Sequence, residues 1–151
     1  MQEPIERIRS LPNALETLVQ HLTAEQLTTP YIPGEWTIAQ NIHHLADSQM
    51  NLFIRFKLIL LEDHPMLKPF EQDDWAKTAD STHAEIDESL AIIRGVHLRL
   101  ARLLESLSPA DLERTGHHPE RGIISLGSLV SYFGDHGWLH VDQIKQVLAA
   151  I

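Results

Sequence analysis

The stretch that decides the fold is residues 36–62, WTIAQNIHHLADSQMNLFIRFKLILLE. Its apolar residues recur at steps of three and four, the spacing that places side chains on one face of an α-helix. Thr37 is placed to cap this helix, because a threonine oxygen can accept a hydrogen bond from a free N–H of the first turn. The sequence therefore predicts an amphipathic helix that ends near Glu62, with an apolar stripe of Ile38, Ile42, Leu45, Leu52, Phe53, Phe56 and Leu60.

Three further segments show the same spacing. The first runs from about Pro4 to Leu22, with Pro12 as a point where it bends or breaks. The next begins at Thr82 and Glu85, which have capping-box spacing, and continues to about residue 107. The last begins near Ser125. None of the four is apolar all round, so each must bury one face, and four such faces can share one core. We therefore predict an all-α fold, a four-helix bundle forming a single domain over residues 1–151.

Long connections link the predicted helices. Thr23 and Ser108 each begin a short capped turn. Residues 63–81 contain two prolines and no sustained periodicity, so we predict a long connection laid over the bundle, and such loops often carry function. Residues 116–124, GHHPERGII, are predicted to be irregular or extended. Strand content should be nearly nil.

Composition narrows the functional classes. A net charge of −9 without any basic tract argues against nucleic acids or anionic membranes as partners, although a small anionic ligand stays compatible with it. The first ten residues do not resemble a secretion signal, and no apolar run approaches the ~20 residues of a membrane span, so we expect a cytoplasmic protein. Exposed apolar residues on amphipathic helices would allow a homodimer. With no cysteine, any metal must be bound by nitrogen or oxygen.

Among the ten histidines, spacing singles out one pair. His136 and His140 are four residues apart on the last predicted helix, so their side chains stand one above the other and can bind the same ion. A facing helix would have to supply a third ligand, and His43 and His44 are the candidates. Periodicity does not choose between them, since they lie on opposite flanks of the apolar stripe. His44 shares its flank with a ladder of polar residues: Asn41, Ser48, Asn51 and Arg55.

Residues 36–76 and the later DHGWLHVDQI, residues 135–144, resemble the DinB-type metalloproteins, and closely the YfiT branch of metal-dependent hydrolases. The specific parts are HHLADS and KPF-x-x-D-x-W, and the similarity runs from Trp36 to Gln143. The resemblance implies a four-helix bundle with one divalent ion bound by His44, His136 and His140. In this family the pattern often continues as HHLADSH. Gln49 stands in place of that last histidine, which puts in doubt any chemistry or substrate preference that the histidine would serve.

Three imidazoles typically leave a coordination position open for water or substrate. Zinc is the default ion and nickel the next. Such an ion lowers the pKa of water towards about 7, which favours metal-assisted hydrolysis of a small-molecule substrate. Three alternatives stay open. One is transfer of a low-molecular-weight thiol of the bacillithiol type, which the resemblance implies. The others are a non-catalytic bundle that binds a metal or ligand, and a helical interaction protein without a metal.

Asn51 and Arg55 are the candidates for catalytic groups beside the metal, with Asp47 and Gln143 as further ones. Arg55 would either hold a carboxylate or phosphate of the substrate or be a surface arginine paired with an acid such as Glu62. In the long connection, residues 68, 74 and 75 would cover the pocket, or its aromatic residues would only seal the bundle. Five other histidines lack the spacing of metal ligands, and we expect them at surface, core or loop positions: His64, His83, His97, His117 and His118.

Overall fold

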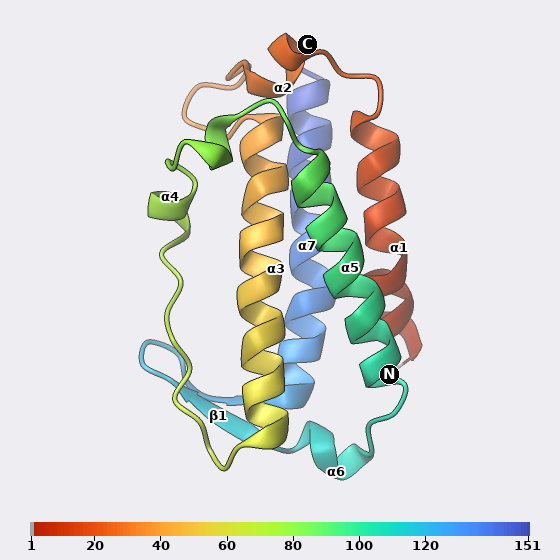
Figure 1. Ribbon diagram of the computed structural model, residues 1–151, viewed down its shortest axis with the longest axis vertical. Helices are drawn as coiled ribbons and strands as arrows, with labels where there is room; N and C mark the ends of the chain where they lie inside the picture. The colour runs from red at the N-terminus through yellow and green to blue at the C-terminus, as the bar shows by residue number, and fades with distance from the viewer. Residues whose placement is uncertain (1) are drawn as a thin grey trace.

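The computed structural model describes residues 2–151, and four long helices form a bundle (Figure 1). They are α1 (Gln2–Val19), α3 (Ile38–Leu61), α5 (Asp87–Leu104) and α7 (Leu126–Leu148). The predicted four-helix bundle is confirmed. Shorter elements lie in the connections: α2 (Ala24–Thr28), α4 (Gln72–Trp75), the 3-10 helix η1 (Asp80–Thr82), α6 (Pro109–Leu112), β1 (Thr115–His118) and β2 (Gly122–Ser125).

The order of the helices around the bundle brings α3 beside α7. Helices α1 and α7 run in one direction, and α3 and α5 run in the other (Figure 1). The main packed pairs are α1 with α5, α1 with α7, α3 with α5, and α3 with α7. Helices α1 and α3 are thus diagonal, although they follow each other among the long helices. Because α3 and α7 are neighbours, side chains from these two helices can meet in one site.

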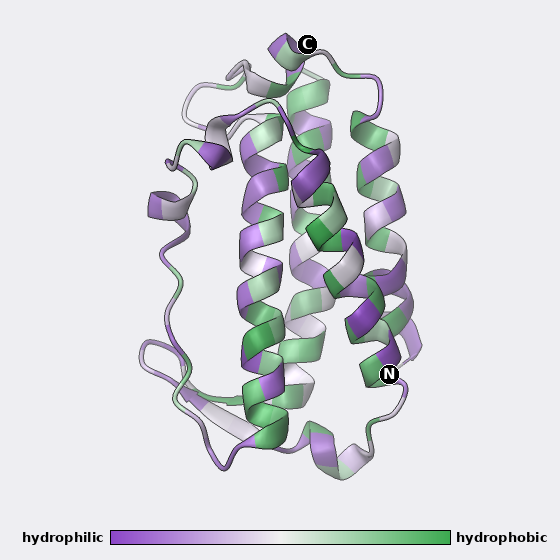
Figure 2. Cartoon of the chain, viewed as in Figure 1, coloured by the Kyte–Doolittle hydropathy of each residue, from purple (hydrophilic) through white to green (hydrophobic). Residues whose placement is uncertain are grey.

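Each long helix buries one face. Hydrophobic and hydrophilic residues alternate along the helices in Figure 2, as one-sided burial requires. The buried apolar residues form two clusters, to which α7 contributes residues 126–133 and residues 141–147. The predicted ligands His136 and His140 lie between these two stretches. Among residues 2–151, no helix combines the length and apolar character that crossing a bilayer needs.

Local capping chemistry fixes several helix starts as predicted. Thr37 Oγ1 accepts a hydrogen bond from the N–H of Gln40 at 3.1 Å, and the Gln40 side chain accepts one from the N–H of Thr37 at 3.0 Å. This reciprocal pair fixes the first turn of α3, seven residues before His44. Equivalent capping boxes begin α2 at Thr23 and α6 at Ser108.

The predicted capping box at Thr82 is wrong. Helix α5 begins at Asp87, and Thr82 belongs to η1, where its hydroxyl donates to the carbonyl of Ala79 at 3.1 Å. Glu85 contacts the imidazole of His83 instead of a helix N–H. The sequence spacing was suitable, but both side chains have nearer partners in the preceding turn.

Pro12 lies inside an unbroken α1. A proline has no N–H, so the carbonyl of Ile8, four residues earlier, loses its helical partner. His97 of α5 supplies the replacement, because its Nδ1 lies 2.7 Å from that carbonyl oxygen. The helix therefore continues through Pro12, with its missing hydrogen bond made between two helices.

Residues 116–124, which the sequence marks as irregular or extended, lie within the antiparallel hairpin β1–β2, which spans residues 115–125. Gly122 has φ +74° directly after its turn, a conformation that a glycine adopts without strain. The long connection pairs with this hairpin: the N–H of Leu67 donates to the carbonyl of His117 at 2.8 Å. These contacts fix the connection where it passes α3, as the left side of Figure 1 shows.

Candidate metal centre

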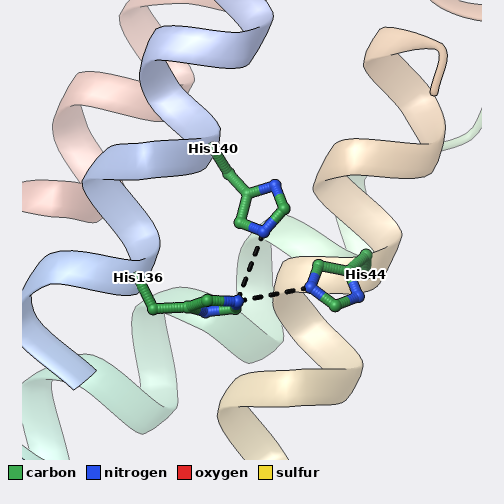
Figure 3. Close-up of side chains that lie close together, drawn as sticks. All are labelled: His44, His136 and His140. Atoms are coloured by element: carbon green, nitrogen blue, oxygen red, sulfur yellow. Dashed lines mark hydrogen bonds between the residues drawn. The ribbon is translucent and has the colours of Figure 1, made fainter. Parts of the chain in front are cut away.

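The imidazoles of His44, His136 and His140 point at one another between α3 and α7 (Figure 3). His136 Nε2 lies 3.5 Å from His44 Nε2 and 3.3 Å from His140 Nε2. All three side chains are buried, with exposed fractions of 2%, 8% and 5% for His44, His136 and His140. The three residues form a group that can hold a single metal ion.

The donor set itself fits a cation. The Asn41 amide donates from Nδ2 to the carbonyl of Thr37 at 3.0 Å, so its oxygen faces His140 Nδ1 at 2.9 Å and accepts a hydrogen bond from it. A neutral His140 then presents a lone pair on Nε2. His136 Nε2 faces two other ring nitrogens, those of His44 and His140, and it carries at most one hydrogen that it can donate to them. The ring nitrogens therefore cannot satisfy each other, whereas one ion can accept a lone pair from each.

Burial keeps these imidazoles uncharged. Burial first, and then the neighbouring His136, lowers the pKa of His44 to about 3 and that of His140 to about 3. The pKa of His136 is lowered to about 4, again first by burial and then by the positive charge of Arg121. Since a metal binds the deprotonated ring nitrogen, the three side chains are already in the binding form at neutral pH.

A second amide lies behind His136. Gln49 is fully buried, and its side-chain nitrogen lies 3.3 Å from His136 Nδ1, while its oxygen has no hydrogen-bond partner in residues 2–151. When the amide oxygen faces the ring, Nδ1–H donates to it and Nε2 is left to bind the ion. In the structure the Gln49 nitrogen faces Nδ1, and a turn of this amide by 180° gives His136 the arrangement that Asn41 gives His140.

Aromatic rings surround the histidines. Trp36 contacts His44 with ring centroids 4.7 Å apart and stacks on His140 at 6.1 Å. Phe70 stacks on His44 at 6.0 Å, and Tyr132 stacks on His136 at 5.2 Å. These rings limit the access of water to the histidines on several sides and restrict the orientation of each imidazole.

Two hollows adjoin the histidines. The wider one has a volume of about 380 Å³ and reaches His136 and His140. The narrower one has a volume of about 70 Å³ and reaches His44 and His136. Tyr132 and Gln72 line both. The wide pocket is further lined by Ile32, Gly34, Glu35, Trp36, Asn41, Asp73, Leu139, Gln143, Gln146 and Val147.

The two candidates for catalytic groups both line the narrow cavity. Asn51 is half-buried, and its amide donates to the carbonyl of Asp47 at 2.9 Å. Arg55 donates to the carbonyl of Lys68 at 2.6 Å and forms no ion pair with Glu62 or any other acid in residues 2–151. The alternative of a surface arginine paired with an acid therefore does not describe Arg55.

Of the other predicted site residues, only some line the two hollows. Gln143 lines the wide pocket. Asp47 lines neither hollow, and burial raises the pKa of its carboxyl. From the long connection, Phe70 and Gln72 reach the hollows, whereas Lys68, Asp74 and Trp75 do not line them. Trp75 packs against Phe70 with ring centroids 4.9 Å apart, so it supports the cover from outside.

His43 points away from the cluster. Its Nδ1 lies 2.8 Å from the hydroxyl of Ser89 on α5, and its Nε2 lies 3.0 Å from the carbonyl of His83. His43 therefore joins α3 to the segment that precedes and begins α5. Two other histidines, which by their spacing were not predicted as metal ligands, are buried: His97 in the core, and His118 at the narrow cavity.

Sequence reasoning missed several residues around the histidines. Tyr132 precedes His136 by four residues, a spacing that could have revealed it. Gln49 was noted only as a departure from the family pattern. His118 and Arg121 come from the hairpin, and no periodicity connects that segment to α3 or α7.

Comparison with known proteins agrees with this geometry. A "Putative metal-dependent hydrolase" of Oceanobacillus iheyensis is 44% identical over 147 residues, covering 97% of this chain and 85% of the relative. One of Geobacillus kaustophilus with the same description is 47% identical over 149 residues, covering 97% and 83%.

A solved structure has the same fold. YfiT from Bacillus subtilis, described as "a probable metal-dependent hydrolase with an unusual four-helix bundle topology", matches with a TM-score of 0.92 and 35% identity over 97% of this chain and 84% of that one. The model of the DinB superfamily matches residues 7–144. These matches confirm the resemblance expected from the sequence motifs, and the chain belongs to the DinB superfamily.

Proposed function

We propose that this protein is a metal-dependent hydrolase in which His44, His136 and His140 hold one divalent ion, zinc first and nickel next. The observation that carries the proposal is the convergence of three buried, neutral imidazole nitrogens beside a pocket of about 380 Å³. Three histidine ligands without a fourth are typical of catalytic zinc sites, which keep a position open for substrate or water. The descriptions of the relatives support the same class.

When bound, the ion supplies Lewis acidity and lowers the pKa of water towards about 7. The chain supplies the rest. Asn41 and Gln49 orient two of the rings, and Tyr132 lines the pocket where a substrate carbonyl would lie. Among the described residues of the wide pocket, Glu35 and Asp73 bear carboxylates that can accept a proton from water. Asn51 is an amide, so it can orient a group but cannot act as the base.

Metal content tests the ligand set. Protein without an affinity tag, freed of metal with a chelator and reloaded with zinc or nickel, should bind about one ion per chain, as measured by mass spectrometry of the elements. Replacing His44, His136 or His140 by alanine should reduce this to a small fraction. The matched control is His43→Gln, which changes the adjacent buried histidine and should retain the ion. Equal metal content in His44→Ala and the wild type would contradict the proposed ligands.

Activity tests the reaction. Zinc-loaded and nickel-loaded protein should hydrolyse some members of a panel of esters and amides, and His140→Ala should lose at least about a hundredfold in rate, because the activating ion is absent. A parallel assay supplies a low-molecular-weight thiol with an electrophile. Metal-dependent thiol transfer without hydrolysis would replace the hydrolase assignment by the transferase, and neither activity in fully loaded protein would favour a non-catalytic binding role.

A further inference from the structure

The narrow cavity beside the histidines gathers positive charge that is not neutralised by an ion pair among residues 2–151. Arg55 from α3 and Arg121 from the turn between β1 and β2 both line it. Neither forms an ion pair within the part of the chain that the structure describes. Glu120 also lines the cavity, but it lies within 4 Å of neither guanidinium nitrogen. The chain has 21 acidic and 12 basic residues, yet two of its arginines line this one small cavity.

The positive groups of this cavity repel one another, and the carboxylate of Glu120 offsets this only in part. The pKa of Arg55 is lowered, first by burial and then by the charge of Arg121. The pKa of His118, in the same cavity, is lowered by burial and then by the charge of Arg55. Like charges held together in a partly desolvated place repel each other, and a bound anion would relieve that repulsion.

The geometry connects this charge to the metal centre. The Arg121 guanidinium carbon lies 5.5 Å from the centre of the Tyr132 ring, and Tyr132 in turn stacks on His136. The cavity also reaches His44 and His136 directly. A group held by the arginines would therefore lie next to the proposed ion.

Arg55 is held in place for such contact. Its Nη2 donates to the carbonyl of Lys68 at 2.6 Å, while its other two guanidinium nitrogens have no hydrogen bond within residues 2–151. A guanidinium presents its donors in a planar fork that matches the oxygens of a carboxylate or phosphate. A volume of about 70 Å³ suits a group of a few non-hydrogen atoms, since a water molecule occupies about 30 Å³ of the liquid.

We propose that Arg55 and Arg121 form an oxyanion site that binds a carboxylate or phosphate group of the substrate beside the metal centre. The residues of the narrow cavity alone support anion binding, whereas the use of this site by a substrate rests on the proposed hydrolase function. The substrate is then an anionic compound whose charged group lies a few bonds from the reacting bond. Its remaining part occupies the wide pocket, which the narrow cavity meets at His136 and Tyr132.

The test uses two small probes, acetate and inorganic phosphate, titrated into metal-free protein at pH 7 and constant ionic strength. Binding is followed by NMR through the side-chain Nε–Hε signals of arginine, with acetamide as the uncharged control. We expect saturable binding of at least one anion and none of acetamide. Arg121→Gln and Arg55→Gln should each weaken it by about tenfold or more, a loss of about 1.4 kcal/mol. Arg102→Gln removes the same charge from an exposed position on α5 and should change affinity less than twofold.

The relative affinity of the two probes identifies the group, with tighter acetate indicating a carboxylate and tighter phosphate a phosphate. Arg121 is exposed, and its substitution removes a surface contact with the Tyr132 ring but no buried packing, so Arg121→Gln keeps the test valid if Arg55→Gln unfolds. Absence of saturable binding of both anions, or equal affinity in Arg121→Gln and Arg102→Gln, would overturn the proposal. Arginine-dependent anion binding in a protein that hydrolyses nothing when loaded with metal would overturn only the hydrolase assignment.

Discussion

At the scale of single residues, two buried amides face the ring nitrogens that point away from the ion. Asn41 accepts from His140 Nδ1, and Gln49 lies against His136 Nδ1. Such partners fix the tautomer and the ring orientation of a metal ligand. His44 differs, because its Nδ1 is buried without a hydrogen-bond partner in residues 2–151, and aromatic rings position it instead.

We predict that Asn41→Ala and Gln49→Leu each weaken zinc binding by about 10–100-fold, because a ring free to rotate or to change tautomer binds the ion less well. Competition with a chromophoric chelator measures the affinity. Asn51→Ala is the matched control, since it removes an amide from the same helix that bonds only to the Asp47 carbonyl. Zinc affinity equal to that of Asn51→Ala in both variants would contradict the orienting role.

His97 should make stability depend on pH. Burial lowers its pKa from 6.5 to about 4, although its hydrogen bond to the Ile8 carbonyl acts in the opposite direction. Since the pKa is lower in the folded state than in the unfolded state, protonation favours unfolding. The free energy of unfolding is therefore unaffected by this group above pH 6.5 and falls between pH 6.5 and 4, by up to about 3 kcal/mol.

Chemical denaturation of metal-free wild type and His97→Gln over this pH range provides the measurement. The difference between the two proteins isolates His97, because the three histidines of the metal site titrate in both. Wild type should lose more stability than the variant as the pH falls from 6.5 to 4. Parallel pH profiles would show that His97 is not held neutral by burial.

At the scale of helices, α1 and α7 are in close contact at Gly137. A methyl group added there would lie 2.4 Å from Leu11 Cδ2 and 3.2 Å from Leu11 Cδ1, both closer than van der Waals contact. Leu11 is itself buried and has little space to move. Gly137 therefore lets α1 approach α7 beside the ligand His136, which the DHGWLH motif alone did not indicate.

We predict that Gly137→Ala lowers the free energy of unfolding by about 1–3 kcal/mol, because the extra methyl overpacks the contact between α1 and α7. Gly95→Ala on α5 is the control, since nothing lies within 4 Å of the added carbon. That change should instead stabilise the protein by up to about 1 kcal/mol through helix propensity. Denaturant unfolding measures both, and equal effects of the two substitutions would exclude a close contact at Gly137.

Local sequence signals predicted all four long helices but not all of the residues at which helices begin. The caps at Thr23, Thr37 and Ser108 were predictable because each partner lies three residues away. Thr82 had similar spacing and failed, since the carbonyl of Ala79, directly before η1, accepts from its hydroxyl. Pro12 failed to break α1 because His97, 85 residues later, replaces the missing hydrogen bond.

At the scale of the whole molecule, the metal site joins α3 to α7, two neighbouring helices separated by a long stretch of chain. We predict that zinc at about a thousand times its dissociation constant stabilises the folded state by about 4 kcal/mol, because the unfolded chain lacks the assembled site. This corresponds to a rise in the unfolding temperature on the order of 10 °C.

Scanning calorimetry with zinc or with a chelator measures this shift. His140→Ala should show almost none of it, while His117→Ala, which removes an exposed histidine from the hairpin, should show all of it. An equal shift in His140→Ala and His117→Ala would mean that zinc stabilises the protein from another place.

The sequence by itself determined the four amphipathic helices and the adjacency of His136 and His140, because both depend on spacing within one helix. The motifs shared with the family pointed to His44. Only the tertiary structure decided that α3 lies against α7, that His43 turns to Ser89, and that the hairpin brings Arg121 and His118 to Arg55. Helical periodicity fixes the direction of a side chain around its own axis, whereas the partner that it meets depends on packing between segments far apart in the chain.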